Sequence, residues 1–418
     1  MFSSQQQSTQ SPEQLRQAFD TACTVHSQGH LPEALQHYLL LLKHLPHFPL
    51  LHYNLGLVRY DLGDYAEALH AFATADTLAP ADVDTLFNLA LCHKQTGDAA
   101  AAIATYRRLL ALEPDHADCL YNLGGCYLGR HEDQEAMACY RQVLALRPDY
   151  LSAVNNLAYL HHRAGETEQA IARYGQVLEQ RPEDESVRYL LAALLGIPLD
   201  QAPDAYVRNF FDTYAEGFEQ HLVDGLGYDN PRQLLACLGH SPAGGTRYAH
   251  GLDLGCGTGL SGQAFCDTVA ELDGVDLSAK MLAQAVQKGC YARLHHDSIL
   301  HHLADTEASY DFFLATDVFI YVGELEPIFT AARTTARPGA LFCFSTERLD
   351  ADGYRLLPTG RFAYAPAYIK DVADRTGWRV LTREAVPLRR HGDAWLAGDV
   401  WICRLVPGDE NNGWQTDH

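Results

Sequence analysis

The sequence predicts an α plus α/β chain: an N-terminal α-solenoid of repeated helix pairs, followed by a Rossmann-like domain with a seven-stranded sheet. Two observations support this division. Proline recurs every 34 residues through the first half of the chain, a period typical of stacked helix pairs. After Pro198 this register stops, and short apolar runs alternate with helical stretches, as they do in βαβ architectures.

The composition is that of an acidic globular chain. Its 31 Lys and Arg residues stand against 53 Asp and Glu, for a formal net charge of −22. Because phosphate binding needs clustered cations, we expect no nucleic acid partner. No apolar run approaches the roughly 20 residues that span a bilayer, and the N-terminus lacks the pattern of a secretory signal, so we expect no membrane association.

Cysteine and histidine give no indication of a metal site. The 11 cysteines are scattered without a C-x-x-C pair, which is typical of reduced thiols in a cytoplasmic protein. The histidines are densest at His295, His296, His301 and His302, but no carboxylate or thiolate spacing accompanies them. We therefore interpret them as surface or loop residues and predict no metal.

Five in-phase repeats occupy residues 15–182. Each repeat has an alanine, an aromatic residue four positions later, and a proline eight positions after that. The three columns are Ala34, Ala68, Ala102, Ala136 and Ala170; Tyr38, Phe72, Tyr106, Tyr140 and Tyr174; and Pro46, Pro80, Pro114, Pro148 and Pro182. Small residues let two helices approach closely, the aromatic ring fills the gap between them, and proline ends the second helix.

This pattern resembles the tetratricopeptide repeat. The resemblance implies that residues 183–197 form a capping helix that seals the stack, and residues 1–14 are predicted to be a disordered lead. Asparagine recurs on the first helix of four repeats, at Asn54, Asn88, Asn122 and Asn156. In this family that helix lines the concave face, so the resemblance implies a ladder of amides that binds a protein or peptide partner. The alternative is that these amides brace neighbouring repeats.

Residues 198–407 are predicted to form the α/β domain, and residues 408–418 a disordered tail. The strand candidates are residues 248–254, 271–275, 291–295, 310–316, 340–345, 379–383 and 399–405. Helical stretches separate the first five candidates, whereas the last two are nearly consecutive. We therefore predict a mostly parallel sheet that ends in an antiparallel hairpin.

The chemistry lies after the first strand, in GLDLGCGTGLSG at residues 251–262. A glycine-rich turn there lets backbone N–H groups approach a ligand at the start of the next helix. Asp253 directly precedes the glycines, which follow G-x-G-x-G rather than the G-x-G-x-x-G of dinucleotide enzymes. Asp276 ends the second strand, where an acidic residue can accept both hydroxyls of a ribose.

From about residue 206 to 405 the chain resembles a class I S-adenosylmethionine-dependent methyltransferase, whose first motif DLGCGTG matches at every position. The resemblance implies S-adenosylmethionine as cofactor, with the methionine and ribose wrapped by the turn, the ribose held by Asp276, and the amino group oriented by Asp253. The implied cofactor contacts are Asp253, Gly255, Cys256, Gly257 and Gly259 on the turn; Asp276, Leu277 and Met281 near ribose and adenine; Asp297 and Ser298 at the adenine edge; and Thr316, Asp317 and Val318 beside the methyl group. The alternatives are a copy of the fold that no longer binds, and a nicotinamide-binding domain.

An aromatic stretch precedes the first strand. It resembles a bacterial group that fuses tetratricopeptide repeats to such a domain, which implies that Tyr206 and Tyr214 form a lid on the cofactor and that His221 reaches the pocket. The alternative is core packing. Arg361 and Tyr364 fall in the insertion after the fifth strand, where acceptors are usually recognised in this family.

The methyl acceptor is unknown. If the acceptor needs a general base, the candidates are Asp317, Tyr321, His221 and Glu347, although Asp317 could equally be a structural hydrogen-bond acceptor. The sequence ATDVFIYVG lacks an NPPY-like tetrad, which disfavours an amide or exocyclic amine acceptor.

We interpret the chain as a methyltransferase whose repeats recruit a protein substrate or carrier. The alternatives are a small-molecule methyltransferase of quinone or acyl-carrier type that uses its repeats for assembly, and a non-catalytic scaffold with a cofactor-sensing domain. The intact Asp253 and Asp276 favour an enzyme.

Overall fold

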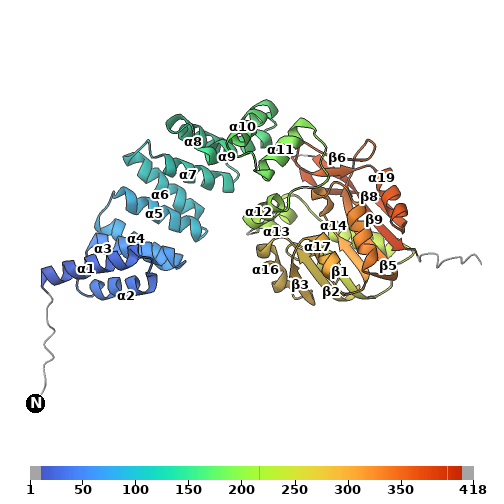
Figure 1. Ribbon diagram of the computed structural model, residues 1–418, viewed down its shortest axis with the longest axis horizontal. Helices are drawn as coiled ribbons and strands as arrows, with labels where there is room; N and C mark the ends of the chain where they lie inside the picture. The colour runs from blue at the N-terminus through green and yellow to red at the C-terminus, as the bar shows by residue number, and fades with distance from the viewer. Residues whose placement is uncertain (1–10, 216, 393, 407–418) are drawn as a thin grey trace, which may run out of the picture. The chain divides into compact units, whose positions relative to one another are not determined.

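A computed structural model describes residues 11–215, 217–392 and 394–406, and the chain divides into two compact units between Val177 and Leu178. The first unit consists of consecutive antiparallel helices, coloured blue to teal in Figure 1. They are α1 (Pro12–Ser27), α2 (Leu31–Leu42), α3 (Pro49–Asp61), α4 (Tyr65–Leu78), α5 (Val83–Gln95), α6 (Ala99–Leu112), α7 (Ala117–Gly129), α8 (Asp133–Leu146), α9 (Leu151–Arg163) and α10 (Thr167–Gln180). These helices form the five pairs that the 34-residue period predicts.

The predicted columns of small and aromatic residues hold each pair together. Ala68 and Phe72 are fully buried, as are their counterparts in the other repeats. A Cβ placed on Gly56 would come within 2.7 Å of the Phe72 ring, so this close helix approach requires glycine. The tight turns between paired helices need positive φ, which Gly63 supplies at 82° and His131 at 61° in the fourth repeat.

Two predicted boundaries differ from the structure. Residues 11–14 are helical or capping rather than disordered, because α1 begins at Pro12 with a reciprocal capping box between Ser11 and Gln14. Residues 1–10 and the predicted tail lie outside the described residues. Helix α11 (Glu185–Leu195) was expected only to seal the repeats, but Tyr189 and Ala193 lie in the hydrophobic core of the second unit.

The second unit contains a seven-stranded sheet in the order β3-β2-β1-β4-β5-β9-β8. Strands β3, β2, β1, β4 and β5 are parallel, and β9 and β8 form the predicted antiparallel hairpin at the edge. The strands are β1 (Tyr248–Leu254), β2 (Val269–Asp276), β3 (Arg293–His296), β4 (Tyr310–Ala315), β5 (Ala336–Glu347), β8 (Trp378–His391) and β9 (Ala394–Leu405). A small hairpin of β6 (Tyr354–Leu356) and β7 (Phe362–Tyr364) was not predicted, because three residues show no periodicity.

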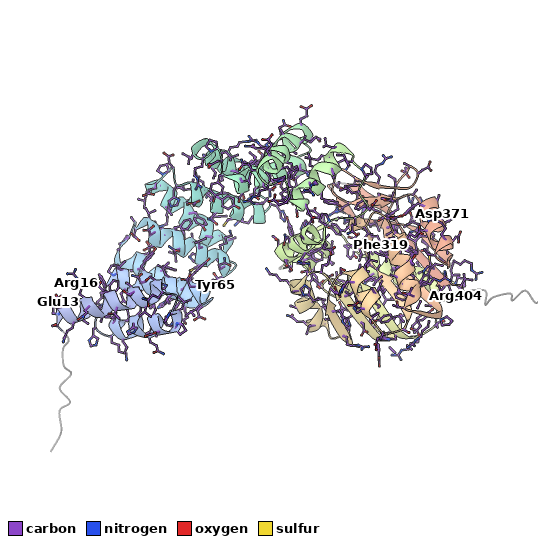
Figure 2. All side chains as sticks on the ribbon, in the orientation of Figure 1. Glu13, Arg16, Tyr65, Phe319, Asp371 and Arg404 are labelled. Carbon is purple, nitrogen blue, oxygen red and sulfur yellow. The ribbon has the colours of Figure 1, made fainter. Side chains whose placement is uncertain are left out.

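Helices cover both faces of this sheet. They are α12 (Asp204–Tyr214), α13 (Phe218–Gln220), a π-helix (His221–Gly225), α14 (Asn230–His240), α15 (Leu260–Phe265), α16 (Ala279–Lys288), α17 (Ile299–Asp305), a 3₁₀ turn (Phe319–Tyr321), α18 (Glu326–Thr334) and α19 (Pro366–Arg375). Phe312 packs with α14 and α15, whereas its neighbour Phe313 packs with α17, α18 and α19. Phe319, labelled in Figure 2, is fully buried in the second of these cores.

Among the described residues, every helix is too short or too polar to cross a bilayer. Within the same ranges, no cluster of three or more His, Cys, Asp or Glu residues is arranged to hold a metal ion.

Candidate active site

The glycine-rich turn lies where the strand order reverses, between β1 and its neighbours β2 and β4. Ligands of open α/β sheets bind in the crevice at this point. Gly255, Gly257 and Gly259 all have positive φ, between 53° and 94°. A Cβ on Gly255 would meet Val318 at 2.7 Å, whereas one on Gly257 would meet nothing within 4 Å. The turn thus packs against the β4 loop at Gly255 and faces open space at Gly257.

Asp276 fastens this turn to the end of β2. Its Oδ2 accepts a hydrogen bond from the Gly257 amide at 2.9 Å, and its Oδ1 accepts one from the Ser278 amide at 2.8 Å. Burial raises the pKa of Asp276, and these two hydrogen bonds oppose the rise. Each carboxylate oxygen has a further lone pair, so Asp276 can still accept a pair of hydroxyls.

Asp253 is fully buried at the end of β1, and one of its oxygens lacks a partner. Its Oδ2 accepts a hydrogen bond of 2.7 Å from the Tyr291 hydroxyl, which in turn accepts one from the Gly262 amide. Among the described residues, no group donates to Oδ1. Burial raises the pKa of Asp253 to about 7. An unpaired buried carboxylate oxygen is costly, so this atom fits a cationic or hydrogen-bonding ligand group.

The aromatic stretch before β1 lies over α16, the helix that begins directly after Asp276. Ser278, the N-cap of α16, donates a hydrogen bond of 2.5 Å to Asp212. Further along, Gln284 donates to the carbonyl of Ala215, and Lys288 pairs with Glu219 at 2.9 Å. No residue of α12 is buried, although Tyr206, Phe210, Phe211 and Tyr214 form an aromatic stripe along it.

The residues expected around the adenine differ in what they contact. Met281 is buried on α16 and Leu277 is half-buried beside it. The Asp297 carboxylate accepts hydrogen bonds from the Ser298 amide at 2.7 Å and from His301 at 2.6 Å. These interactions lower the pKa of Asp297. Ser298 caps α17, so both residues have a local structural role beside any contact with a ligand.

The candidate base Asp317 is held in an ion pair. Its backbone has a φ of 60°, which is uncommon for a residue other than glycine. Its carboxylate accepts a hydrogen bond of 2.6 Å from Arg389, and Arg389 also contacts Glu347 at 3.2 Å. Arg389 is 1% exposed. Two of the four candidate bases therefore share one buried cation.

The remaining candidates separate into different environments. Thr316 bonds to Ser261 through its hydroxyl, and Cys256 is buried within the turn. Tyr321 is half-buried beside the rings of Phe210 and Phe211. The other two candidates lie elsewhere: His221 is exposed on the π-helix, and Tyr364 is a core residue whose hydroxyl donates to the Phe319 carbonyl at 2.7 Å.

The asparagine column of the repeats is partly satisfied within the chain. The side-chain amides of Asn54, Asn88 and Asn122 each donate to a backbone carbonyl four residues earlier at 2.9 Å. Asn88 also donates to the Tyr53 hydroxyl of the preceding repeat, and Lys94 donates to Asn122. Asn156 is half-buried on α9. At least two members of the column therefore brace neighbouring repeats.

Sequence reasoning missed four polar residues of this region: Asp212, Tyr228, Tyr291 and Arg389. The buried hydroxyl of Tyr228 lies near Thr316 and Asp317. Tyr291 opens the predicted third strand and carries no motif. Asp212 and Tyr228 lie in the stretch FDxYAxxFxxHLxxxLGY, which predicted the lid, so this stretch was the signal that could have found both residues.

Comparison with known families places both kinds of domain on this chain. A model described as methyltransferase domain matches residues 252–339. Three tetratricopeptide repeat models match residues 27–83, 81–149 and 134–194. The first half of the chain therefore matches tetratricopeptide repeats, and the second unit contains a match to a methyltransferase domain.

Two curated methyltransferases are similar to part of the chain. The human methyltransferase-like protein 27 is 31% identical over 163 residues, which are 38% of this chain and 64% of that protein. The ubiquinone biosynthesis O-methyltransferase of Azoarcus sp. (strain BH72) is 29% identical over 151 residues, which are 32% of this chain and 64% of that protein. The chain thus spans less than two thirds of the length of these relatives.

Two solved structures are also similar. MamA of Desulfovibrio magneticus RS-1 is 20% identical, with a TM-score of 0.39, over 41% of this chain and 97% of that one. The DhpI–SAH complex is 18% identical, with a TM-score of 0.36, over 48% of this chain and 95% of that one.

Proposed function

We propose that this protein is an S-adenosylmethionine-dependent methyltransferase whose tetratricopeptide repeats recruit a protein, either the substrate or a carrier of it. The observation that supports the cofactor most strongly is the unpaired Oδ1 of Asp253, beside a glycine turn that faces open space at Gly257. An ammonium group matches a buried carboxylate oxygen in charge and in donors.

The residues at the ends of β1 and β2 would hold the cofactor. Asp253 would accept from its amino group, Asp276 would accept from the ribose, and the backbone of Gly257 would allow close approach. Met281 and Leu277 supply an apolar surface for the adenine, with Asp297 and Ser298 at its edge. When bound, the cofactor supplies an electrophilic methyl group on a sulfonium.

The protein's own task is then to orient the acceptor and exclude water. The aromatic residues of α12 suit water exclusion, because they are apolar and lie on the segment that is fastened to α16. Arg389 holds the Asp317 carboxylate in an ion pair, so Asp317 is better suited to positioning than to accepting a proton. The ion pair of Asp317 with Arg389 therefore favours a methyl acceptor that needs no strong base.

The partner of the repeats is a protein or peptide in this proposal. Beyond the hydrogen bond to its own helix, Asn54 has a second side-chain N–H, as does Asn122, and Asn88 has its side-chain carbonyl oxygen. These groups can pair with a peptide backbone regardless of its sequence. All eleven cysteines are free thiols, which supports a reducing compartment, and we propose the cytoplasm.

The cofactor proposal is tested by thermal unfolding with ligands. S-adenosylhomocysteine should raise the melting temperature of the wild type, and NAD should not. A hundredfold excess over Kd corresponds to about 2.7 kcal/mol of stabilisation. Asp276→Ala should abolish the shift, because the ribose loses its acceptor, whereas the exposed Asp267→Ala on the same unit should retain it. Equal protection of both variants would remove Asp276 from the site.

A further inference from the structure

Arg361 stands out among the cations of the second unit because of what surrounds it. It is half-buried at the start of β7, on a tight hairpin that is closed by hydrogen bonds from Leu357 to Arg361 and from Gly360 to Leu357. Its charge acts on the hydroxyls of Tyr189, Tyr206 and Tyr321, where it opposes the rise in pKa that burial causes. The Tyr189 hydroxyl donates a hydrogen bond of 2.9 Å to the Gly360 carbonyl, and a Cβ on Gly360 would lie 3.6 Å from the Tyr206 hydroxyl, so both phenols lie beside the hairpin that carries Arg361.

Within the described residues, no carboxylate lies within ion-pair distance of Arg361. Arg389 makes a direct contrast, because it is buried in the same unit and contacts both Asp317 and Glu347. Cations taken out of water are normally paired, since phenols do not neutralise their charge. A half-buried arginine with no acidic partner among the described residues is therefore suited to an anion from outside the chain.

The surroundings of Arg361 are also flat and apolar. Tyr206 packs on Tyr189 with ring centroids 4.9 Å apart, and Phe210 and Phe211 approach Tyr321 at 6.4 and 5.5 Å. Tyr189 is fully buried, whereas Tyr321 and the rings on α12 are only partly covered. Aromatic faces left partly open favour a planar unsaturated partner.

We propose that Arg361 binds the carboxylate of the methyl acceptor, and that this acceptor is a small carboxylic acid with a planar, unsaturated body. The guanidinium fork matches a carboxylate in two parallel hydrogen bonds. The body of the acceptor packs against the partly covered rings of α12 and Tyr321, on the side of Asp317. This inference rests on the proposed function and names its substrate class; the repeats then recruit a protein that supplies or carries the acid.

The test uses matched pairs of simple probes on the full-length protein with S-adenosylhomocysteine. Benzoate and phenylacetate are compared with benzyl alcohol and 2-phenylethanol by ligand-observed saturation-transfer NMR. The two carboxylates should bind the wild type and the two alcohols should bind at least tenfold more weakly. Arg361→Gln should weaken the carboxylates by about tenfold or more, as loss of a charge-assisted hydrogen bond does, and Arg361→Lys should recover part of this loss.

The matched control is Arg355→Gln, which removes an exposed arginine from β6 of the same hairpin and should bind all probes like the wild type. Thermal protection by S-adenosylhomocysteine reports folding of each variant and tests the cofactor site separately. If protection is present but the wild type does not discriminate carboxylates from alcohols, or Arg361→Gln discriminates equally, the acceptor inference is overturned. If the wild type shows no protection, the proposed function fails and this inference with it.

Discussion

Two groups of carboxylates in the second unit differ in whether they have partners within the chain. Asp317 follows β4 and Glu347 ends β5, and both contact Arg389. At the end of β1, Asp253 has one oxygen bonded to Tyr291 and the other without a donor among the described residues. Because buried polar atoms normally have hydrogen-bond partners, we expect the ligand to bind at Asp253, whose second oxygen lacks a donor, and not at the carboxylates that Arg389 already contacts. The same contrast separates Arg389 from Arg361.

The largest effect is a loss of stability, and it is expected at Arg389, which contacts both Asp317 and Glu347. Arg389→Met removes the buried cation and leaves two carboxylates close together, so the free energy of unfolding should fall by about 3–5 kcal/mol. Urea denaturation followed by circular dichroism measures this loss. The exposed Arg355→Gln should leave the unfolding curve almost unchanged. A stable Arg389→Met variant would show that Asp317 and Glu347 do not depend on the ion pair.

The open carboxylate should make cofactor binding depend on pH. Because burial raises the pKa of Asp253 to about 7, the folded apoprotein holds a proton that the unfolded chain releases near pH 4. Stability from this group is therefore present at low pH and is lost as the pH rises from about 4 to 7, by up to about 1.4 kcal/mol per unit. A ligand ammonium favours the ionised form, so affinity for S-adenosylmethionine should rise up to tenfold per pH unit until about pH 7.

Calorimetric titration from pH 5.5 to 8.5 checks this dependence. Asp253→Asn cannot titrate and should flatten the rise, whereas the exposed Asp267→Ala should follow the wild type. A wild-type affinity that stays constant across pH 7 would mean that Asp253 does not change its charge when the cofactor binds.

The smallest effect concerns the repeats, where the asparagine amides are partly satisfied already. Replacing Asn88 and Asn122 together by alanine should weaken capture of a partner by about tenfold, since each lost hydrogen bond costs about 0.5–1.5 kcal/mol. Protection by S-adenosylhomocysteine should not change, because the pocket belongs to the other unit. Pull-downs with the full-length protein measure capture. Recovery of the same partners by both proteins would leave these residues with the bracing role alone.

Much of the fold was predictable, because it depends on local patterns. The 34-residue columns predict every helix pair of the repeats, and strand 248–254 coincides with β1. Strand 379–383 was predicted too short, because β8 continues through Pro387, Arg389 and Arg390 by pairing with β9. The additional residues of β8 form a strand because they pair with β9, and not because their polar and apolar side chains alternate.

The candidate site likewise contains residues that sequence motifs predict and residues that they do not. Asp253, the glycines and Asp276 follow one another closely enough to form motifs. Arg389 does not, because Asp317 and Glu347 lie 72 and 42 residues away along the chain. The approach of Arg361 to Tyr189 and Tyr206 likewise depends on a hairpin that has no sequence signal. Contacts between distant segments were therefore the part that sequence reasoning missed.

The most direct test of the account compares S-adenosylhomocysteine with 5′-methylthioadenosine, which lacks the amino acid part, by calorimetry at pH 8. If the open oxygen of Asp253 receives the amino group, Asp253→Asn should weaken S-adenosylhomocysteine by about tenfold to a hundredfold and leave 5′-methylthioadenosine unchanged. Equal loss for both ligands, or no loss for either, would contradict the assignment of Asp253 to the amino group.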